Sequence, residues 1–200
     1  MNDIKRIAFF DFDGTITSKD TLPEIIKFQK GNLSFYIGIL LHLPWLLGYK
    51  LGLVSNDAAK QKLLQYFFGG MREEVFQENC DAFASTRLGH LIRPEALREI
   101  GRLKTDNTEI VVVSASAGRW IRKWSDSLEL ELISTSLEIK SGRITGRIEG
   151  INCHGREKVR RIRERWNLEE FDEVYAYGDS EADKPMLALA TKSFYKPFVP

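Results

Sequence analysis

Two aspartates, Asp11 and Asp13, stand one residue apart directly after the apolar run Ile7–Phe10. Carboxylates at the end of a buried strand repel each other and lose hydration, so a cation or a proton has to compensate their charge. Gly14 follows them and allows the backbone to bend tightly, which lets both carboxylates face one pocket. Such a pair suits a reaction in which one carboxylate attacks phosphorus to form an acyl phosphate and the other transfers a proton.

Polar side chains also follow two other apolar runs. Ser114 comes after the run EIVVV, and Asp179 and Asp183 come after the run EVYAY. Lys158 stands near the start of a basic helical pattern between these two runs. Because the carboxyl ends of the strands form the binding edge of an open α/β sheet, we expect these residues to lie close to Asp11. Carboxylates and hydroxyls around one lysine are typical of a site for Mg²⁺ and a phosphate group.

Strand and helix patterns alternate along the chain between these motifs. Apolar runs predict buried strands, and alternating runs around Ser141–Gly142 predict a hairpin. The expected strands are 5–11, 109–114, 130–133 and 173–177, with the hairpin over 137–150 and a short last strand at 193–195. The expected helices are 94–103, 118–128, 157–166 and 182–190. This alternation predicts an α/β fold with a doubly wound parallel sheet.

A block of helical patterns interrupts the strands soon after the first one. Its breaks fall at Gly31, at Leu43–Pro44 and at Gly69–Gly70. We therefore expect a catalytic core made of residues 1–16 and 89–200, with an α-helical cap domain, residues 17–88, inserted after the first motif.

The composition favours a folded protein and indicates which partners and which location to expect. A chain of 200 residues with 43% hydrophobic and 28% charged residues is typical of a folded, soluble protein. The net charge of +1 and the lack of a long basic run argue against nucleic acid as a partner. Cys80 and Cys153 lack the spacing of a metal site, and the N-terminal residues are too polar for a signal peptide. We expect a cytoplasmic protein that is a monomer or a homodimer.

One segment of the helical block, Leu33–Tyr49, carries no formal charge over 17 residues. The favoured interpretation is a set of buried or partly buried cap helices, because His42, Pro44 and two glycines break the run. Contact with a membrane surface through residues 33–54 is the alternative, and the protein would then be peripheral to the membrane. A true membrane span is the least favoured of the three.

The motifs together resemble those of a known family. The sequence DFDGT, the strand-borne Ser114, Lys158 and the sequence GDSEAD are similar, in order and spacing over the whole chain, to the motifs of the haloacid dehalogenase (HAD) superfamily of hydrolases. The phosphoserine-phosphatase-like branch, subfamily IB, resembles this chain most, since its helical cap is inserted just after the first motif. The resemblance implies a HAD-like Rossmannoid core and phosphatase activity.

The resemblance also implies a role for each matching residue. Asp11 would be the nucleophile that carries the aspartyl phosphate. Asp13 would be the general acid that protonates the leaving oxygen and the general base that later activates water. Thr15 and Ser114 would donate hydrogen bonds to the phosphoryl oxygens, and Lys158 would neutralise their charge.

The same resemblance implies Mg²⁺ as the cofactor. Asp11, the main-chain carbonyl of Asp13 and Asp179 would ligate the ion. Asp183 would be a further ligand, or it would orient the metal-bound waters and Lys158.

The substrate is less defined by these motifs. Asp20 stands where phosphoserine phosphatases place a cap glutamate, but the cap stretch Asn56–Tyr66 holds Lys60 and Lys62 and no arginine to grip a carboxylate with two parallel hydrogen bonds. We favour a small, phosphoserine-like metabolite phosphomonoester. Because Leu33–Val54, followed later by the short segment NCHGREK, also resembles the phosphatidylglycerophosphatase-C type of the same superfamily, a lipid headgroup phosphate is an alternative. A phosphotransferase or phosphomutase would keep the same motifs and is a further alternative.

Overall fold

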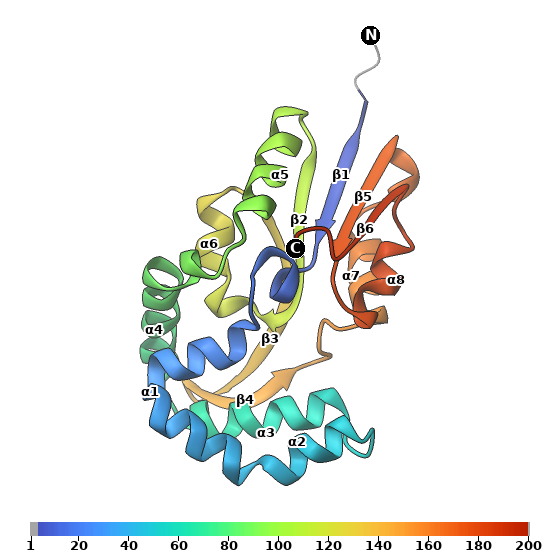
Figure 1. Ribbon diagram of the computed structural model, residues 1–200. Helices are drawn as coiled ribbons and strands as arrows, with labels where there is room; N and C mark the ends of the chain where they lie inside the picture. The colour runs from blue at the N-terminus through green and yellow to red at the C-terminus, as the bar shows by residue number, and fades with distance from the viewer. Residues whose placement is uncertain (1–3, 200) are drawn as a thin grey trace.

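The computed structural model describes residues 4–199 and contains one six-stranded sheet (Figure 1). The strand order is β4-β3-β2-β1-β5-β6, and every neighbouring pair is parallel except β3 and β4. The strands are β1 (Arg6–Phe10), β2 (Glu109–Ala117), β3 (Glu131–Lys140), β4 (Arg143–Glu149), β5 (Glu173–Gly178) and β6 (Lys192–Tyr195). This sheet confirms the predicted α/β class.

Helices cover both faces of the sheet, as expected for a doubly wound fold. On one face lie α5 (Pro94–Thr105) and α6 (Arg122–Ser127), and on the other lie α7 (Arg156–Arg165) and α8 (Lys184–Leu187) (Figure 1). Successive side chains of a strand point to opposite faces, so β1 supplies both cores. Ala8 and Phe10 join the cluster under α5, whereas Ile7 and Phe9 join the cluster under α7 and α8.

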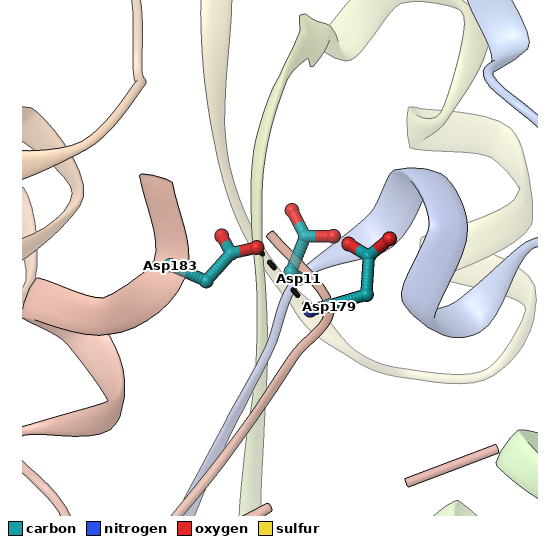
Figure 2. Close-up of side chains that lie close together, drawn as sticks. All are labelled: Asp11, Asp179 and Asp183. Carbon is teal, nitrogen blue, oxygen red and sulfur yellow. Dashed lines mark hydrogen bonds between the residues drawn. The ribbon is translucent and has the colours of Figure 1, made fainter. Parts of the chain in front are cut away.

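The central position of β1 determines where polar side chains meet. Its two neighbours are β2 and β5, and all three strands run in the same direction. Asp11, which follows β1, and Asp179, which follows β5, therefore emerge at the same edge of the sheet (Figure 2).

The structure corrects one detail of the predicted sheet. Residues 130–133 and the first arm of the expected hairpin form a single strand, β3, rather than two. Its first half pairs in parallel with β2 and its second half pairs antiparallel with β4. The intervening Ser134-Thr135-Ser136 contains no glycine or proline that would end the strand. The predicted turn at Ser141–Gly142 is confirmed, and both residues adopt positive φ.

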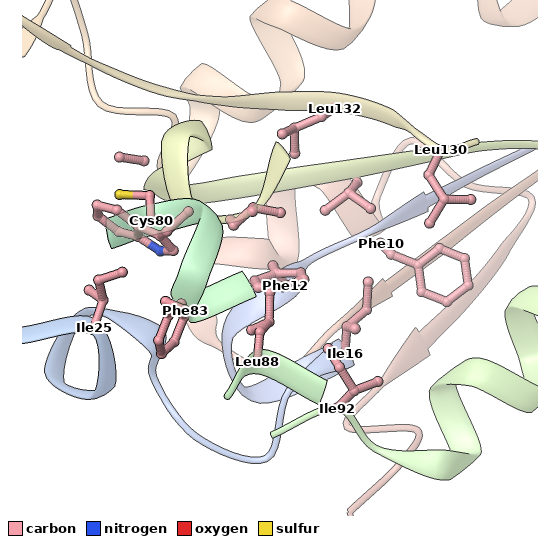
Figure 3. Close-up of a cluster of buried hydrophobic side chains, with 14 of the residues drawn as sticks. Phe10, Phe12, Ile16, Ile25, Cys80, Phe83, Leu88, Ile92, Leu130 and Leu132 are labelled. Carbon is pink, nitrogen blue, oxygen red and sulfur yellow. The ribbon is translucent and has the colours of Figure 1, made fainter. Parts of the chain in front are cut away.

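Four helices lie between β1 and α5 in the sequence, and they face the carboxyl edge of the sheet (Figure 1). They are α1 (Thr21–Leu41), α2 (Leu43–Lys50), α3 (Asn56–Phe68) and α4 (Glu73–Thr86). A non-helical residue, Gly31, kinks α1, as its sequence predicts. Ile25 of α1 and Phe83 of α4 belong to the same buried cluster as Phe12, which follows β1 (Figure 3). The division into core and cap at the expected boundaries stays a prediction.

The apolar segment of α1 and α2 differs from the favoured expectation. Within residues 33–49 only Phe35 and Gly38 are buried, and most of the large side chains face outward. The prediction of buried or partly buried helices therefore holds for the side that faces α3 and is wrong for the outer side, where the large side chains are exposed. The reason is that α3 covers only one side of α1 and α2, and no described element covers the other side.

The four helices α1–α4, which we call the helical block, contact the sheet through β4. Main-chain hydrogen bonds join Gly70 and Met71 to Ile144, and the backbone of α3 packs directly on Gly146. A Cβ atom on Gly146 would lie 2.4 Å from Cα of Gln65, closer than real contacts allow. Only a glycine permits this approach.

We expect Gly146→Ala to lower the free energy of unfolding by about 1–3 kcal/mol, the usual cost of an overpacked contact. In thermal melts that loss corresponds to roughly 2–4 °C per kcal/mol for a chain of this size. Gly142→Ala is the matched control, because Gly142 also has a positive φ but nothing lies within 4 Å of its added Cβ. Equal losses in the two variants would show that backbone conformation, and not contact with α3, is what matters at Gly146.

Candidate active site

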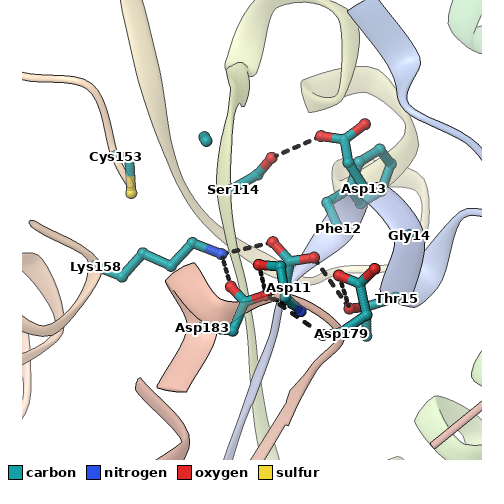
Figure 4. Close-up of polar contacts among 12 residues, drawn as sticks. Asp11, Phe12, Asp13, Gly14, Thr15, Ser114, Cys153, Lys158, Asp179 and Asp183 are labelled. Carbon is teal, nitrogen blue, oxygen red and sulfur yellow. Dashed lines mark hydrogen bonds and ion pairs between the residues drawn. The ribbon is translucent and has the colours of Figure 1, made fainter. Parts of the chain in front are cut away.

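Asp11 lies at the carboxyl end of β1 and is almost completely buried. Its Oδ1 accepts a hydrogen bond from Nζ of Lys158 at 2.5 Å, and the same ammonium donates to Oδ1 of Asp183 at 2.6 Å. Lys158 comes from the first turn of α7 and Asp183 from the turn after β5, and both are 1% exposed. One buried cation therefore bridges two carboxylates from different elements (Figure 4).

Burial dominates the electrostatics of this group. Loss of hydration raises the pKa of Asp11 to about 7. The charges of Asp183 and Asp13 add to this rise, and the ammonium of Lys158 opposes it. Burial also disfavours the ammonium form of Lys158, but the two carboxylates that it contacts raise the pKa of the lysine above its ordinary value. Lys158 is therefore charged at neutral pH and stabilises the ionised form of Asp11.

Gly14 and Thr15 bring the end of β5 against the end of β1. Gly14 has φ +86°, and a Cβ atom there would lie 2.3 Å from Oδ2 of Asp179. The hydroxyl of Thr15 donates to Oδ2 of Asp11 at 3.0 Å and lies 3.4 Å from Oδ1 of Asp179. This turn therefore places the carboxylates of Asp11 and Asp179 side by side.

Three carboxylates at this edge could hold a metal ion. Oxygen atoms of Asp11, Asp179 and Asp183 all lie within 4.8 Å of one another (Figure 2). Carboxylate oxygens are hard donors, which Mg²⁺ prefers over nitrogen or sulfur ligands. The chemistry of this donor set therefore fits the predicted ion.

Asp183 is engaged by both of its oxygens. Oδ1 accepts from Lys158, while Oδ2 accepts from the main-chain nitrogen and the hydroxyl of Ser180 at 3.0 and 2.6 Å. Of the two roles expected for Asp183, these contacts support the orientation of Lys158 and of the loop that carries Asp179.

Asp13 is held by residues that sequence analysis did not single out. Its Oδ1 accepts hydrogen bonds from the main-chain nitrogen and the hydroxyl of Thr21 at 2.7 and 2.6 Å. That hydroxyl in turn accepts from Nε1 of Trp120 at 3.0 Å. Ser114 donates to Oδ2 of Asp13 at 3.4 Å. The first turn of α1 therefore fixes one oxygen of Asp13.

The residues expected to bind the phosphoryl oxygens lie next to the carboxylates. The hydroxyls of Thr15 and Ser114 are buried and donate to Asp11 and Asp13. A cavity of about 380 Å³ lies against Asp11 and Asp13, and it is lined from β2 by Ala115 and Ser116 rather than by Ser114. The phosphate-binding roles of Thr15 and Ser114 stay predictions.

On the other side, the cavity is lined by the acidic residue Asp20, the basic residue Lys60 and several apolar side chains of the helical block. Desolvation raises the pKa of Asp20 to about 6, the nearby Asp13 contributes to the rise, and Lys60 opposes it. Burial lowers the pKa of Lys60, whose ammonium donates to the carbonyl of Ala115 at 2.5 Å. The apolar lining comes from Leu22, Leu46, Tyr49, Ala59 and Leu63.

A doubly wound sheet with a polar cavity at its carboxyl edge defines the class of α/β enzymes that bind their substrates at this edge. Within that class, a family model of the haloacid dehalogenase-like hydrolases matches residues 8–188. The chain therefore belongs to the haloacid dehalogenase-like hydrolase family.

Comparison with known proteins gives relatives of similar length. The chain is 31% identical over 194 residues to Protein CicA of Caulobacter vibrioides strain NA1000 / CB15N. The aligned residues are 96% of this chain and 86% of that protein. A crystal structure of a protein of unknown function from Bordetella pertussis Tohama I has a TM-score of 0.84 at 20% identity, covering 96% of this chain and 90% of that one. A phosphoserine phosphatase solved with an analogue of its phospho-aspartyl intermediate has a TM-score of 0.64 at 21% identity, covering 96% and 86%. These structures share the fold of this chain.

Proposed function

We propose that the protein is a Mg²⁺-dependent phosphomonoester hydrolase that works through an aspartyl phosphate on Asp11. The observation that carries this proposal is the buried contact of Asp11 with Lys158 beside a cavity that Asp13 also lines. A carboxylate whose ionised form contacts a buried ammonium suits nucleophilic attack on an anionic phosphoryl group. The phosphoserine phosphatase of similar fold, with its phospho-aspartyl intermediate analogue, supports the same chemistry.

The proposed reaction has two steps. A carboxylate oxygen of Asp11 attacks phosphorus, the ester P–O bond breaks, and Asp13 donates a proton to the leaving oxygen. Water then attacks the phosphorus of the aspartyl phosphate, Asp13 accepts its proton, and inorganic phosphate leaves with Asp11 restored. Mg²⁺, held by Asp11, Asp179 and the main-chain carbonyl of Asp13, would neutralise charge on the phosphoryl group.

We expect Asp13→Asn to lower turnover roughly 10²–10⁴-fold, the contribution of a positioned acid or base. The side chain keeps its shape and can still accept from Thr21, so the loss reflects proton transfer. Single-turnover release of the leaving alcohol should fall much more for an alkyl phosphate than for 4-nitrophenyl phosphate, whose leaving group needs no proton. An equal loss with both esters would argue against Asp13 as the general acid.

A small metabolite with both an ammonium and an anionic group is the substrate that the charged cavity lining supports. Asp20 and Lys60 carry opposite charges and line the same cavity as Asp11. A single lysine binds a carboxylate more weakly and with less directionality than an arginine, which forms two parallel hydrogen bonds to it. Phosphate release measured over a panel of soluble phosphomonoesters, with and without Mg²⁺, tests this proposal. No release from any phosphomonoester would contradict it.

A lipid headgroup phosphate is the second candidate, and the apolar lining of the cavity favours it. Leu46 and Tyr49 of α2 and Leu63 of α3 offer an apolar wall to the part of the substrate beyond the phosphate. The same panel should therefore include detergent-dispersed lipid phosphomonoesters. Adding an acceptor alcohol to each reaction would reveal a phosphotransferase, because a new phosphate ester would form in place of inorganic phosphate.

A further inference from the structure

The outer side of α1 and α2 concentrates large apolar side chains at the surface. Of the 19 large apolar side chains that are exposed in the described part of the chain, 11 lie within residues 33–53, and we call this group the apolar face. Its most exposed leucines are Leu33, Leu40, Leu41, Leu51 and Leu53, which are 61–80% exposed. Exposed apolar residues scattered singly need no explanation, but a contiguous group this large indicates a surface that contacts something else.

The charged residues within the segment 26–55, which contains the apolar face, are all positive. Between Ile25 and Asn56 the sequence has no acidic residue, and its charged residues are Lys27, Lys30 and Lys50. Lys62 of α3 adds a further positive charge, because its ammonium lies 5.0 Å from the ring centre of Trp45. In the part of the chain that the structure describes, neither Lys50 nor Lys62 forms a salt bridge. Exposed leucines and a tryptophan flanked by unpaired lysines are complementary to an anionic lipid surface.

The geometry of the two helices suits a position in the plane of a membrane surface. Over residues 4–199 no single helix is long and apolar enough to cross a bilayer, and α1 and α2 meet those criteria only together, with a bend of 63° between them. The part of α1 after the kink at Gly31 forms the outermost layer of the helical block together with α2, and α3 lies between this layer and β4 (Figure 1). The apolar face can therefore contact a flat surface without unfolding any part of the sheet.

We propose that the apolar face docks the protein onto the surface of an anionic phospholipid bilayer. The helix that carries part of this face, α2, also lines the catalytic cavity through Leu46 and Tyr49. Docking therefore places one wall of the cavity close to the lipid headgroups. The attraction comes from burial of leucine and tryptophan side chains among the lipids and from the lysine charges. It does not depend on the chemistry at Asp11, so it can hold or fail independently of the proposed phosphatase activity.

The apolar contribution is tested by co-sedimentation of the full chain with vesicles of phosphatidylglycerol and phosphatidylcholine, without substrate. We expect wild-type protein to bind and the double variant Leu40→Glu/Leu51→Glu to bind at least ~10-fold more weakly, because two leucines lose their burial in lipid. Leu97→Glu on α5 is the matched control, since Leu97 is also exposed but lies outside the apolar face, and it should bind as wild type does. Melting temperatures of all variants should stay unchanged, because these leucines are exposed in the free protein.

The charge contribution is tested with Lys50→Glu/Lys62→Glu. This variant should lose affinity for anionic vesicles at least ~10-fold, and 0.5 M salt should also weaken wild-type binding, because it screens the attraction between the lysines and the anionic lipids. Lys123→Glu/Arg163→Glu, at exposed positions on α6 and α7, is the control for the change in net charge of the same size. Vesicle binding that is absent in the wild type, or unchanged in the leucine variant, would overturn the proposal. So would a concentration-dependent dimer, seen by sedimentation velocity without lipid and disrupted by the leucine variant, because the apolar face would then contact a second copy of the chain.

Discussion

Asp11→Asn is expected to lower turnover of every phosphomonoester at least ~10³-fold, the scale of loss when a nucleophile is removed. Asparagine has the same shape but its amide cannot form the acyl phosphate. The fold should survive the change, because a neutral side chain is easier to bury than the carboxylate whose pKa burial already raises to about 7. Lys158 also keeps its second contact, with Asp183. Phosphate release and a thermal melt of the purified variant measure the two effects.

The covalent intermediate gives this experiment a second readout. Wild-type protein quenched with acid during turnover should carry a phosphoryl group on the peptide that contains Asp11, and the variant should carry none. Asp126→Asn, an exposed aspartate on α6, makes the same chemical change away from the cavity and should leave both turnover and labelling intact. Near-normal turnover in Asp11→Asn, or labelling at another residue in the wild type, would rule out catalysis through Asp11.

Much of the candidate site could be predicted because one rule of parallel sheets joins residues far apart in the sequence. Asp11 and Asp179 each follow a strand, and strands that run in parallel end at one edge. Lys158 was expected at the same edge because it stands at the start of the helix between two of these strands, although a lysine in a basic helix is ordinarily solvated. The structure shows why this one is not: the first turn of α7 directs it between two buried carboxylates.

Contacts between the helical block and the core could not be predicted in the same way. Thr21 holds Asp13 because α1 begins where the chain returns to the cavity, and no sequence pattern encodes that return. Lys60 reaches the carbonyl of Ala115 only because the packing of α3 brings this side chain to the carboxyl end of β2. The exposure of Leu40 was missed for a related reason. Helical periodicity shows which residues share a face, but not whether another element covers it.

The cluster of Asp11, Asp179 and Asp183 predicts that Mg²⁺ stabilises the folded state. Without a cation, Asp11 and Asp179 place like charges close together at the edge of the sheet, and Lys158 compensates only part of that charge. We expect Mg²⁺ to stabilise the folded state by about 2.7 kcal/mol at 100 times its Kd, which raises the melting temperature by roughly 5–10 °C in a chain of this size. This readout needs no substrate, so it tests the metal site separately from catalysis.

Removal of Mg²⁺ with a chelator is expected to reduce phosphate release to background, and added Mg²⁺ should restore it. The reason is that the carboxylates of the cluster repel an anionic phosphoryl group unless a cation neutralises them. Asp179→Asn, which removes one donor and leaves Asp11 in place, should raise the Mg²⁺ concentration for half-maximal activity at least ~10-fold. Asp126→Asn should leave that concentration unchanged. If the chelated protein kept full activity, or if Asp179→Asn needed no more Mg²⁺ than the wild type, the metal could not be held by this cluster during catalysis.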